Sequence, residues 1–202
     1  TELMNCLFGV DKRAGGEIRL NGKDISPRSP LDAVKKGMAY ITESRRDNGF
    51  FPNFSIAQNI AISRSLKDGG YKGAMGLFHE VDEQRTAEAQ RELLALKCHS
   101  VNQNITELSG GNQQKVLISK WLCCHPEVII FDEPTRGIEI YKVMRQLADD
   151  GKVILMVSSE LPEIITVCDR IAVFCEGRLT QILTNRDDMS EEEIMAWALP
   201  HE

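Results

Sequence analysis

Apolar and polar positions at the start of the chain follow two different periods. Residues 1–10 carry apolar side chains at helical spacing up to Gly9, so they predict a helix that ends there. Residues 16–25 instead alternate like a hairpin on either side of Asn21-Gly22, a dipeptide typical of tight turns. The pattern therefore predicts a helix followed by a β-hairpin.

Apolar runs that predict buried strands recur along the rest of the chain. They alternate with segments of helical period, which favours a mostly parallel sheet in an α/β fold. After the first run the strand pattern is interrupted, and a helical insertion is predicted in the middle of the sheet. The strand runs are 38–41, 128–131, 153–157 and 171–174, and the helices are 31–36, 55–65, 81–96, 113–123 and 139–149.

One polar sequence has the composition of a phosphate-binding turn. Residues 108–115 read Leu-Ser-Gly-Gly-Asn-Gln-Gln-Lys, in which Ser109 offers a hydroxyl and Gly110 and Gly111 offer unhindered backbone N–H groups. If a helix opens here, these donors lie at its positive end, where a phosphate is stabilised. An ordinary Ser-Gly-Gly loop is the alternative.

A second polar sequence follows the apolar run 128–131, which ends in Asp132 and Glu133. The carboxyl end of a buried parallel strand is where α/β sheets bind ligands. One carboxylate can hold Mg²⁺, usually through water, and the other can orient and deprotonate an attacking water. Acidic residues at the end of a strand also commonly cap the next helix. The order and spacing of Asp132 and Glu133 after the octet nevertheless favour nucleotide chemistry.

These sequences resemble the signature and Walker B motifs of ATP-binding cassette (ABC) ATPases. The resemblance is closest to the second cassette of double-cassette monosaccharide importers, which serve ribose, galactose and allose, and it covers nearly the whole chain. It rests on 108–115, on Phe-Asp-Glu-Pro-Thr-Arg-Gly-Ile at 131–138 and on Val-Ser-Ser-Glu-Leu-Pro-Glu at 157–163. It implies a P-loop NTPase (RecA-like) core with a mostly parallel sheet and an inserted helical ABC subdomain.

The resemblance also implies a division of the chain into three parts. Residues 1–43 are the first part of the RecA-like core, 44–114 are the helical subdomain that ends in the signature, and 115–202 are the second part of the core with the C-terminal helix. No Gly-x-x-x-x-Gly-Lys-Ser/Thr sequence occurs in the chain. We expect an N-terminally truncated cassette, with Thr1 as the last P-loop residue; a protein that dispenses with the loop is the alternative.

A second gap is expected directly after Ile138. Family members carry an Asp-Val-Gly-containing stretch there, whose aspartate belongs to the D-loop at the dimer seam, and this chain is about six residues shorter. No D-loop aspartate can therefore be assigned. An omitted loop, engineering and a natural deletion remain open.

Two positions bear on whether this half hydrolyses ATP. Most cassettes have a metal-contacting glutamine where this chain has Glu43, and a switch histidine where it has Ser159. Glutamate can hold Mg²⁺ through water, whereas serine cannot become a cation that stabilises γ-phosphate charge. Ser159 is equally suited to cap the helix that follows it. This half is therefore either active or silent, with its signature completing the other site.

The resemblance assigns nucleotide chemistry to specific residues. Glu133 is the expected catalytic base, and Asp132 and Glu43 are the expected partners of Mg²⁺. The expected cofactors are ATP and Mg²⁺, and the expected contacts to them are Thr1, Glu43, Leu108, Ser109, Gly110, Gly111, Asn112, Gln113, Asp132 and Ser159.

Composition and charge restrict the expected partners. A formal net charge of −6 argues against nucleic acid and against anionic membranes. No apolar stretch approaches the ~20 residues that span a bilayer, so membrane association is expected through a protein partner. The 6 cysteines show no Cys-x-x-Cys spacing, which favours buried reduced thiols over zinc or disulfides.

The resemblance implies the assembly in which the chain works. Expected partners are the first cassette of the same subunit, a second copy of the subunit, the permease and, indirectly, a periplasmic sugar-binding protein. Phe50, Phe51 and Phe54 form either a docking patch for the permease or part of the core. The expected place is the cytoplasmic face of the bacterial inner membrane, and the expected cargo is D-allose or a related monosaccharide. A soluble ABC ATPase of DNA repair or translation and a non-hydrolysing regulatory module are the alternatives.

Overall fold

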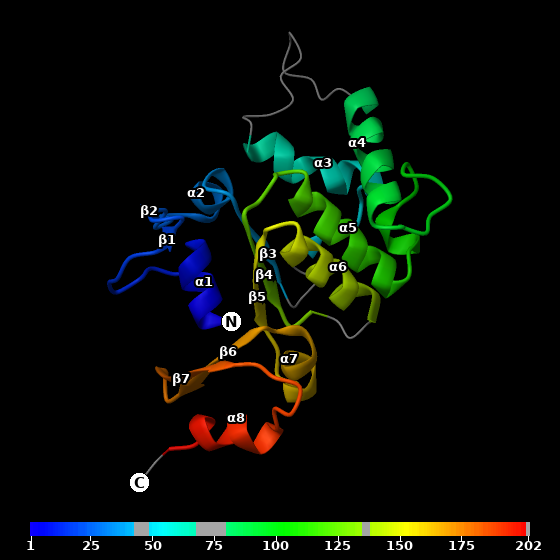
Figure 1. Ribbon diagram of the computed structural model, residues 1–202. Helices are drawn as coiled ribbons and strands as arrows, with labels where there is room; N and C mark the ends of the chain where they lie inside the picture. The colour runs from blue at the N-terminus through cyan, green and yellow to red at the C-terminus, as the bar shows by residue number, and fades with distance from the viewer. Residues whose placement is uncertain (43–48, 68–79, 135–137, 201–202) are drawn as a thin grey trace. The chain divides into compact units, whose positions relative to one another are not determined.

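The computed structural model describes residues 1–42, 49–67, 80–134 and 138–200 (Figure 1). The chain divides into two compact units, Thr1–Leu155 and Met156–Glu202, and each is described by itself. Glu43 and residues 135–137 lie outside the described residues, whereas the predicted D-loop gap follows Ile138, the first described residue after them.

The first unit is built on a sheet in the order β3-β4-β5. Strand β3 (Met38–Ile41) and strand β4 (Val128–Asp132) are parallel and consist of buried residues throughout. Strand β5 (Val153–Val157) continues from the first unit into the second. The parallel pairing of β3 with β4 confirms the predicted α/β fold with a mostly parallel sheet. Both strands appear in the sequence as apolar runs because strands buried on both faces need no alternation of polar residues.

The N-terminal helix and hairpin form as their sequences predict. Helix α1 (Glu2–Phe8) ends at Gly9, whose φ is 77°. A Cβ atom at Gly9 would lie 2.9 Å from the backbone nitrogen of Ser29, so no larger residue fits there. Strands β1 (Arg19–Leu20) and β2 (Lys23–Asp24) are joined by Asn21 and Gly22, both with positive φ.

Helix α2 (Pro30–Lys35) and α1 share an apolar cluster with the sheet. The ring of Phe8 meets Tyr40 of β3 edge-on, with centroids 5.4 Å apart, and meets Trp121 in the same way at 6.0 Å. Such edge-to-face contacts stabilise a core beyond the area that they bury. The cluster thus fixes α1 against the strand that carries Tyr40.

A helical layer is inserted between β3 and β4, as predicted. It consists of α3 (Ile56–Lys67), α4 (Glu80–Leu93), a 3₁₀ turn (Ile105–Glu107) and α5 (Gly110–Leu122), and α6 (Ile138–Asp149) follows β4. Helices α3 and α5 pack directly on each other (Figure 1). Val116 and Leu117 of α5 join the core of this layer, whereas Trp121 and Cys124 at its other end pack on the sheet cluster. Helix α5 therefore connects the inserted layer to the sheet.

The second unit pairs one antiparallel hairpin with two short helices. Its elements are α7 (Leu161–Val167), β6 (Arg170–Cys175), β7 (Arg178–Thr184) and α8 (Glu191–Ala198). Strand β7 was not predicted from the sequence. It pairs with β6 through a two-residue turn, Glu176 and Gly177, both with positive φ. Among the described residues, no helix is sufficiently long and apolar to cross a membrane.

Candidate functional site

Asp132 is held in place by hydroxyl groups from two other elements. It is the last residue of β4 and is 2% exposed. Thr1, at the N-cap position of α1, donates from Oγ1 to Oδ1 of Asp132 over 3.1 Å. Tyr40 of β3 donates to Oδ2 over 2.7 Å. Each oxygen of this buried carboxylate therefore accepts a hydrogen bond, which is how a protein keeps such a group in one orientation.

Tyr40 is a site residue that the sequence analysis did not identify. Burial, followed by the hydrogen bond to Asp132, raises the pKa of its hydroxyl far above the ordinary value of 10.0, so the group remains a donor. The same hydroxyl lies 3.2 Å from Oδ1 of Asn5. The available signal was the tyrosine in an otherwise apolar strand, because a buried phenol needs a partner for its O–H.

Glu133 follows Asp132 in an uncommon backbone conformation. Its φ is 49°, in the left-handed region, and its side chain is half-buried. For a residue with a Cβ atom this conformation costs on the order of 1 kcal/mol, and such strain is found preferentially at functional positions. The strand end thus places two carboxylates in sequence, of which one is buried and bound by hydroxyls and the other is accessible.

The predicted phosphate-binding turn opens helix α5. Ser109 is the N-cap residue, and the helix begins at Gly110, before its predicted start at residue 113. Ser109, Gly110 and Gly111 are exposed, and a Cβ atom at Gly111 would meet nothing within 4 Å. The prediction that these residues stand at the positive end of a helix is confirmed, and the N–H groups of a first helical turn have no acceptor within the helix itself.

Side chains of the octet stabilise this turn by hydrogen bonds to its own residues. Asn112 donates from Nδ2 to Oγ of Ser109 over 2.9 Å and accepts from the N–H of Lys97 over 2.9 Å. Leu108 and Gln113 are buried, and Nε2 of Gln113 donates to the carbonyl oxygen of Leu108 over 3.2 Å. Their predicted contact with nucleotide stays a prediction, while their observed role is to shape the backbone that would make it.

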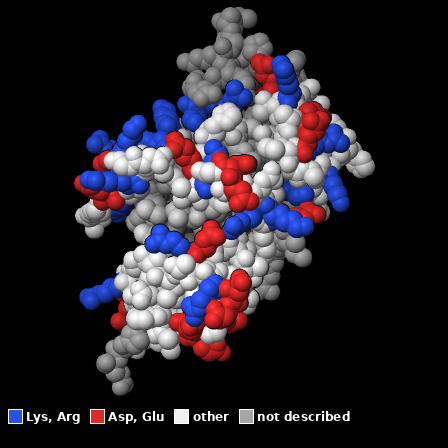
Figure 2. Space-filling view, in the orientation of Figure 1, with Lys and Arg blue, Asp and Glu red and all other residues white. Residues whose placement is uncertain are grey.

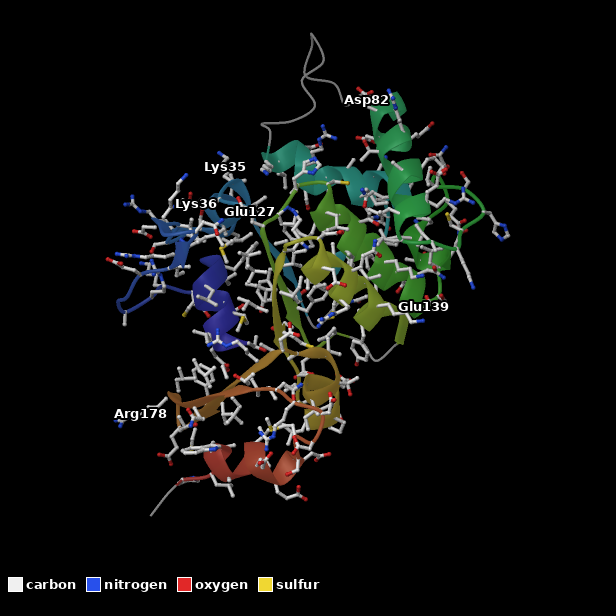
Figure 3. The ribbon with its side chains drawn as sticks, viewed as in Figure 1. Lys35, Lys36, Asp82, Glu127, Glu139 and Arg178 are labelled. Carbon is white, nitrogen blue, oxygen red and sulfur yellow. The ribbon has the colours of Figure 1, made fainter. Side chains whose placement is uncertain are left out.

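Lys115, the last residue of the octet, is also turned inward. Its side chain is 7% exposed and its Nζ lies 2.7 Å from Oε2 of Glu139, which Figure 3 labels. The same Nζ donates to the carbonyl oxygen of Ala95 over 3.3 Å. The hydrogen bond from Lys115 holds the pKa of the Glu139 carboxyl below its usual range. Lys115 therefore links the helix of the phosphate-binding turn to the first turn of α6.

Ser159 belongs to the second unit and is exposed between β5 and α7. The N-cap position of α7 is taken by Glu160, so the alternative prediction that Ser159 caps this helix is wrong. Its neighbour Ser158 serves the helix start instead, accepting from the N–H of Glu160 over 3.1 Å and donating to Oε2 of Glu163 over 2.9 Å. The predicted contact of Ser159 with ATP stays a prediction.

The oxygen atoms of Asp132 and Thr1 suit Mg²⁺ better than a metal ion that takes three or more of its ligands from protein side chains. In the described part of the chain, no three or more His, Cys, Asp and Glu side chains gather into a metal-binding group. Mg²⁺ needs only one or two carboxylates together with water and phosphate oxygens. One buried carboxylate beside the hydroxyl of Thr1 meets that requirement. Cys123 and Cys124 are buried and form no disulfide, and burial raises the pKa of Cys123 to about 12.

The aromatic segment before α3 divides into a buried and an exposed part. Phe50 is 7% exposed and belongs to the core of the helical layer, so the prediction that it forms part of a docking patch is wrong. Phe51 and Phe54 are 46% and 36% exposed, and their rings stack with centroids 5.1 Å apart. The apolar surface here is therefore made by Phe51 and Phe54.

A cavity of about 340 Å³ adjoins this surface. It lies between the start of α3 and helix α4, and its lining includes Phe54, Ala57, Ile62 and Glu83. On the face drawn in Figure 2, acidic and basic side chains are interspersed. The cavity is thus a mainly apolar hollow next to two stacked aromatic rings, of a size that takes one or two side chains of a partner.

The chain is similar to proteins of known class over its whole length. The sequence profile of the family described as "ABC transporter" matches residues 1–136. The D-allose import ATP-binding protein AlsA of Escherichia coli (strain K12) is 95% identical over 208 residues, which cover 100% of this chain and 41% of that protein. The ribose import ATP-binding protein RbsA of a Bacillus cereus strain is 42% identical, over 98% of this chain and 40% of that protein. The chain thus spans about two fifths of the length of these relatives.

Solved structures of lower identity share the fold. An ATP-binding cassette of an ABC transporter superposes with a TM-score of 0.77 at 19% identity, over 96% of this chain and 81% of the other. A dimeric cassette in a post-hydrolysis state with ADP and Pi has a TM-score of 0.71 at 20% identity, over 92% and 80%. The alignment with the allose protein exceeds the 202 residues of this chain, so that relative carries residues within the matched span that this chain lacks.

Proposed function

Because this chain belongs to the ABC transporter family, we propose that it is an ATP-binding and ATP-hydrolysing cassette of an importer that moves D-allose or a related monosaccharide. The observation that carries the ATPase part is the buried Asp132 carboxylate, which is bound by the hydroxyls of Thr1 and Tyr40 and followed by the accessible Glu133. The identity of the sugar is supported by the name of the relative that is 95% identical.

The residues at the end of β4 have separate roles in this proposal. Thr1 and Asp132 would hold Mg²⁺ together with Glu43, and the ion would supply positive charge to the phosphates of ATP. Glu133 orients the attacking water and accepts its proton, because it is the accessible acid of the pair. Tyr40 keeps Asp132 in one orientation through its hydroxyl. A phosphate-binding loop from outside these residues completes the site.

The signature turn is proposed to act on a second nucleotide. Ser109, Gly110 and Gly111 are exposed at the positive end of α5, so they are placed to bind the phosphates of ATP held by an opposing cassette. Leu108, Asn112 and Gln113 support the turn from behind. The opposing cassette would be the first cassette of the same subunit or that of a second copy.

The permease is proposed to dock on Phe51, Phe54 and the adjoining cavity. Two exposed stacked rings beside an apolar hollow are suited to an apolar side chain of a cytoplasmic helix. The sugar would reach the permease through a periplasmic binding protein, and the cassette would lie at the cytoplasmic face of the membrane. The division into 1–43, 44–114 and 115–202 is part of this proposal, with α3 and α4 in the helical subdomain.

A second candidate is a half that binds ATP without hydrolysing it. Ser159 favours this candidate, since an exposed serine cannot supply the cation that a switch histidine can. Under this candidate the signature turn still completes the other site. The two candidates differ only in the rate at which this half turns over ATP.

The proposed function is tested with the complete double-cassette subunit in liposomes, together with its permease and binding protein. ATP turnover is measured with D-allose, ribose, galactose or no sugar. We expect the greatest stimulation with D-allose and accumulation of that sugar inside the liposomes. Equal turnover with and without each sugar would contradict the importer assignment.

A further inference from the structure

The loop that presents Phe51 and Phe54 is held on one side by a buried amide. Asn59 of α3 is 0% exposed. Its Oδ1 accepts from the N–H of Phe51 over 2.8 Å, and its Nδ2 lies 3.1 Å from the carbonyl oxygen of Phe51 and 3.0 Å from that of Ser55. An amide fully satisfied by backbone groups fixes the loop to α3, because losing it would leave several buried polar atoms without partners.

The same loop is held on its other side by a buried ammonium. Lys120 of α5 is 7% exposed, and its Nζ donates to the carbonyl oxygen of Gly49 over 2.5 Å, across 71 positions of sequence. The Nζ also lies 5.2 Å from the centre of the Trp121 ring. Gly49 directly precedes Phe50 and Phe51. A hydrogen bond thereby joins α5 to the start of the segment from Gly49 to Phe54, here called the aromatic loop.

Stability alone does not account for a lysine at this position. Removing an ammonium from water costs several kcal/mol, and one carbonyl oxygen with one aromatic ring replaces only part of its hydration. Burial accordingly lowers the pKa of Lys120 to about 8. A methionine of similar length would fill the same space in this apolar environment without that cost. What the lysine adds is a directional bond between α5 and the loop.

The other end of α5 carries the signature turn. The helix runs from Gly110 to Leu122 with Ser109 as its N-cap, so it is a rod of ~20 Å. Lys120 lies near its C-terminal end and Ser109 at its N-terminal end. Helix α5 packs along α3 and into the core of the helical layer, and close packing of this kind transmits a displacement rather than absorbing it.

We infer that Lys120 is a positioning residue that, by holding the carbonyl of Gly49, transmits movement of the aromatic loop to the signature turn at Ser109. This inference rests on the proposed function, in which Phe51 faces the permease and Ser109 faces ATP. Without this hydrogen bond the surface around Phe51 and the turn at Ser109 both still form, but a movement of one no longer displaces the other. Binding of the permease and basal ATP turnover persist, whereas sugar no longer stimulates turnover.

The inference is tested in the complete subunit, reconstituted with its permease and binding protein. Lys120→Met and Lys120→Gln both end one bond short of the Nζ position; the methionine has no donor, and the glutamine has a neutral one. Lys120→Arg retains a cationic donor. The matched control is Lys67→Met, because Lys67 of α3 also donates to a main-chain carbonyl, in its case that of Cys124 over 2.5 Å.

We expect Lys120→Met and Lys120→Gln to lower the sugar-stimulated part of ATP turnover by about fivefold or more, with basal turnover and permease binding unchanged. Lys120→Arg restores much of the stimulation, and Lys67→Met retains it. Full stimulation in both Lys120→Met and Lys120→Gln overturns the inference. Loss of permease binding in both, or a loss of stimulation that only follows a lowered melting temperature, overturns it as well. Absence of sugar stimulation in the wild type would instead contradict the proposed function.

Discussion

The hydroxyl of Tyr40 donates a 2.7 Å hydrogen bond to Oδ2 of Asp132, joining two neighbouring parallel strands across 92 positions of sequence. Both side chains are almost completely buried. The bond places a neutral donor beside a carboxylate at the strand end, where the account assigns Mg²⁺. This one hydrogen bond therefore both stabilises the sheet and orients Asp132, the proposed ligand of Mg²⁺.

Tyr40→Phe is expected to destabilise this chain by about 1–3 kcal/mol, because it leaves a buried carboxylate oxygen without its donor. The free energy of unfolding is measured by urea denaturation at pH 7 for Tyr40→Phe, Asp132→Ala and the double variant. We expect a coupling energy of about 1 kcal/mol or more between the two sites. Additive effects of the single substitutions would show that the two groups do not interact.

Ser109→Arg is expected to abolish sugar transport by the complete subunit while leaving its fold intact. The side chain is exposed at the start of α5, so added bulk and charge lie at the surface and not in the core. Transport is measured as sugar accumulation in liposomes, and the fold by thermal denaturation. Thr106→Arg, at another exposed position before α5, is the control and keeps transport. Normal uptake by Ser109→Arg would contradict the assignment of the signature turn.

Phe51→Ser together with Phe54→Ser is expected to weaken binding of the permease about tenfold or more, because exposed aromatic rings commonly dominate such interfaces. Binding is measured by co-purification and by titration in detergent. ATP binding and the melting temperature stay near those of the wild type. Phe50→Ser is the contrasting variant, since this buried ring should instead lower the melting temperature. Unchanged permease binding by the double variant would place the docking surface elsewhere.

The pH dependence of stability is expected to reveal the buried ammonium of Lys120. Burial lowers its pKa from 10.5 in the unfolded chain to about 8 in the folded chain, so the unfolded state binds more protons between these values. Lys120 therefore contributes a rise in stability as pH increases from about 8 to 10.5, on the order of 2–4 kcal/mol.

Other buried groups oppose this rise. The pKa of Cys123 is raised from 9.0 by burial, so its contribution to stability is complete below pH 9 and is lost as pH rises further. Denaturation of the wild type and of Lys120→Met from pH 7.5 to 10.5 separates the two effects, because Cys123 is common to both proteins. The wild type should gain stability relative to Lys120→Met over this range. A constant difference would contradict the assignment of a lowered pKa to Lys120.

The strand pattern made the α/β fold predictable from sequence. Strand β3 has the predicted bounds and β4 is longer only by Asp132, because buried parallel strands appear as uninterrupted apolar runs. Strand β5 also has the predicted bounds, although its residues are only partly buried. Strand β7 was missed because its residues mix polar and apolar types with partial exposure. Its turn, Glu176-Gly177, was the signal that could have identified it.

The site was predictable only where its residues are adjacent in sequence. The pair Asp132 and Glu133 and the signature turn were found from local order, whereas the bond of Tyr40 to Asp132 depends on the register of two strands. The same limit applies to Phe50 and Phe51, adjacent aromatics of which one is buried and one exposed. Asn59 and Lys120 gave no local signal, since only folding brings them to the aromatic loop.

The most direct measurement of the central claim is single-turnover release of phosphate by the complete subunit carrying Glu133→Gln, with the other cassette inactivated in its own Walker B acid. The amide retains the shape of the side chain but cannot accept the proton of water. Glu127→Gln, just before the opposite end of β4, is the control. We expect that ATP still binds and that release slows by ~10²-fold or more in Glu133→Gln alone. An unchanged rate in Glu133→Gln would contradict hydrolysis by this half and leave it as a nucleotide-binding partner of the other.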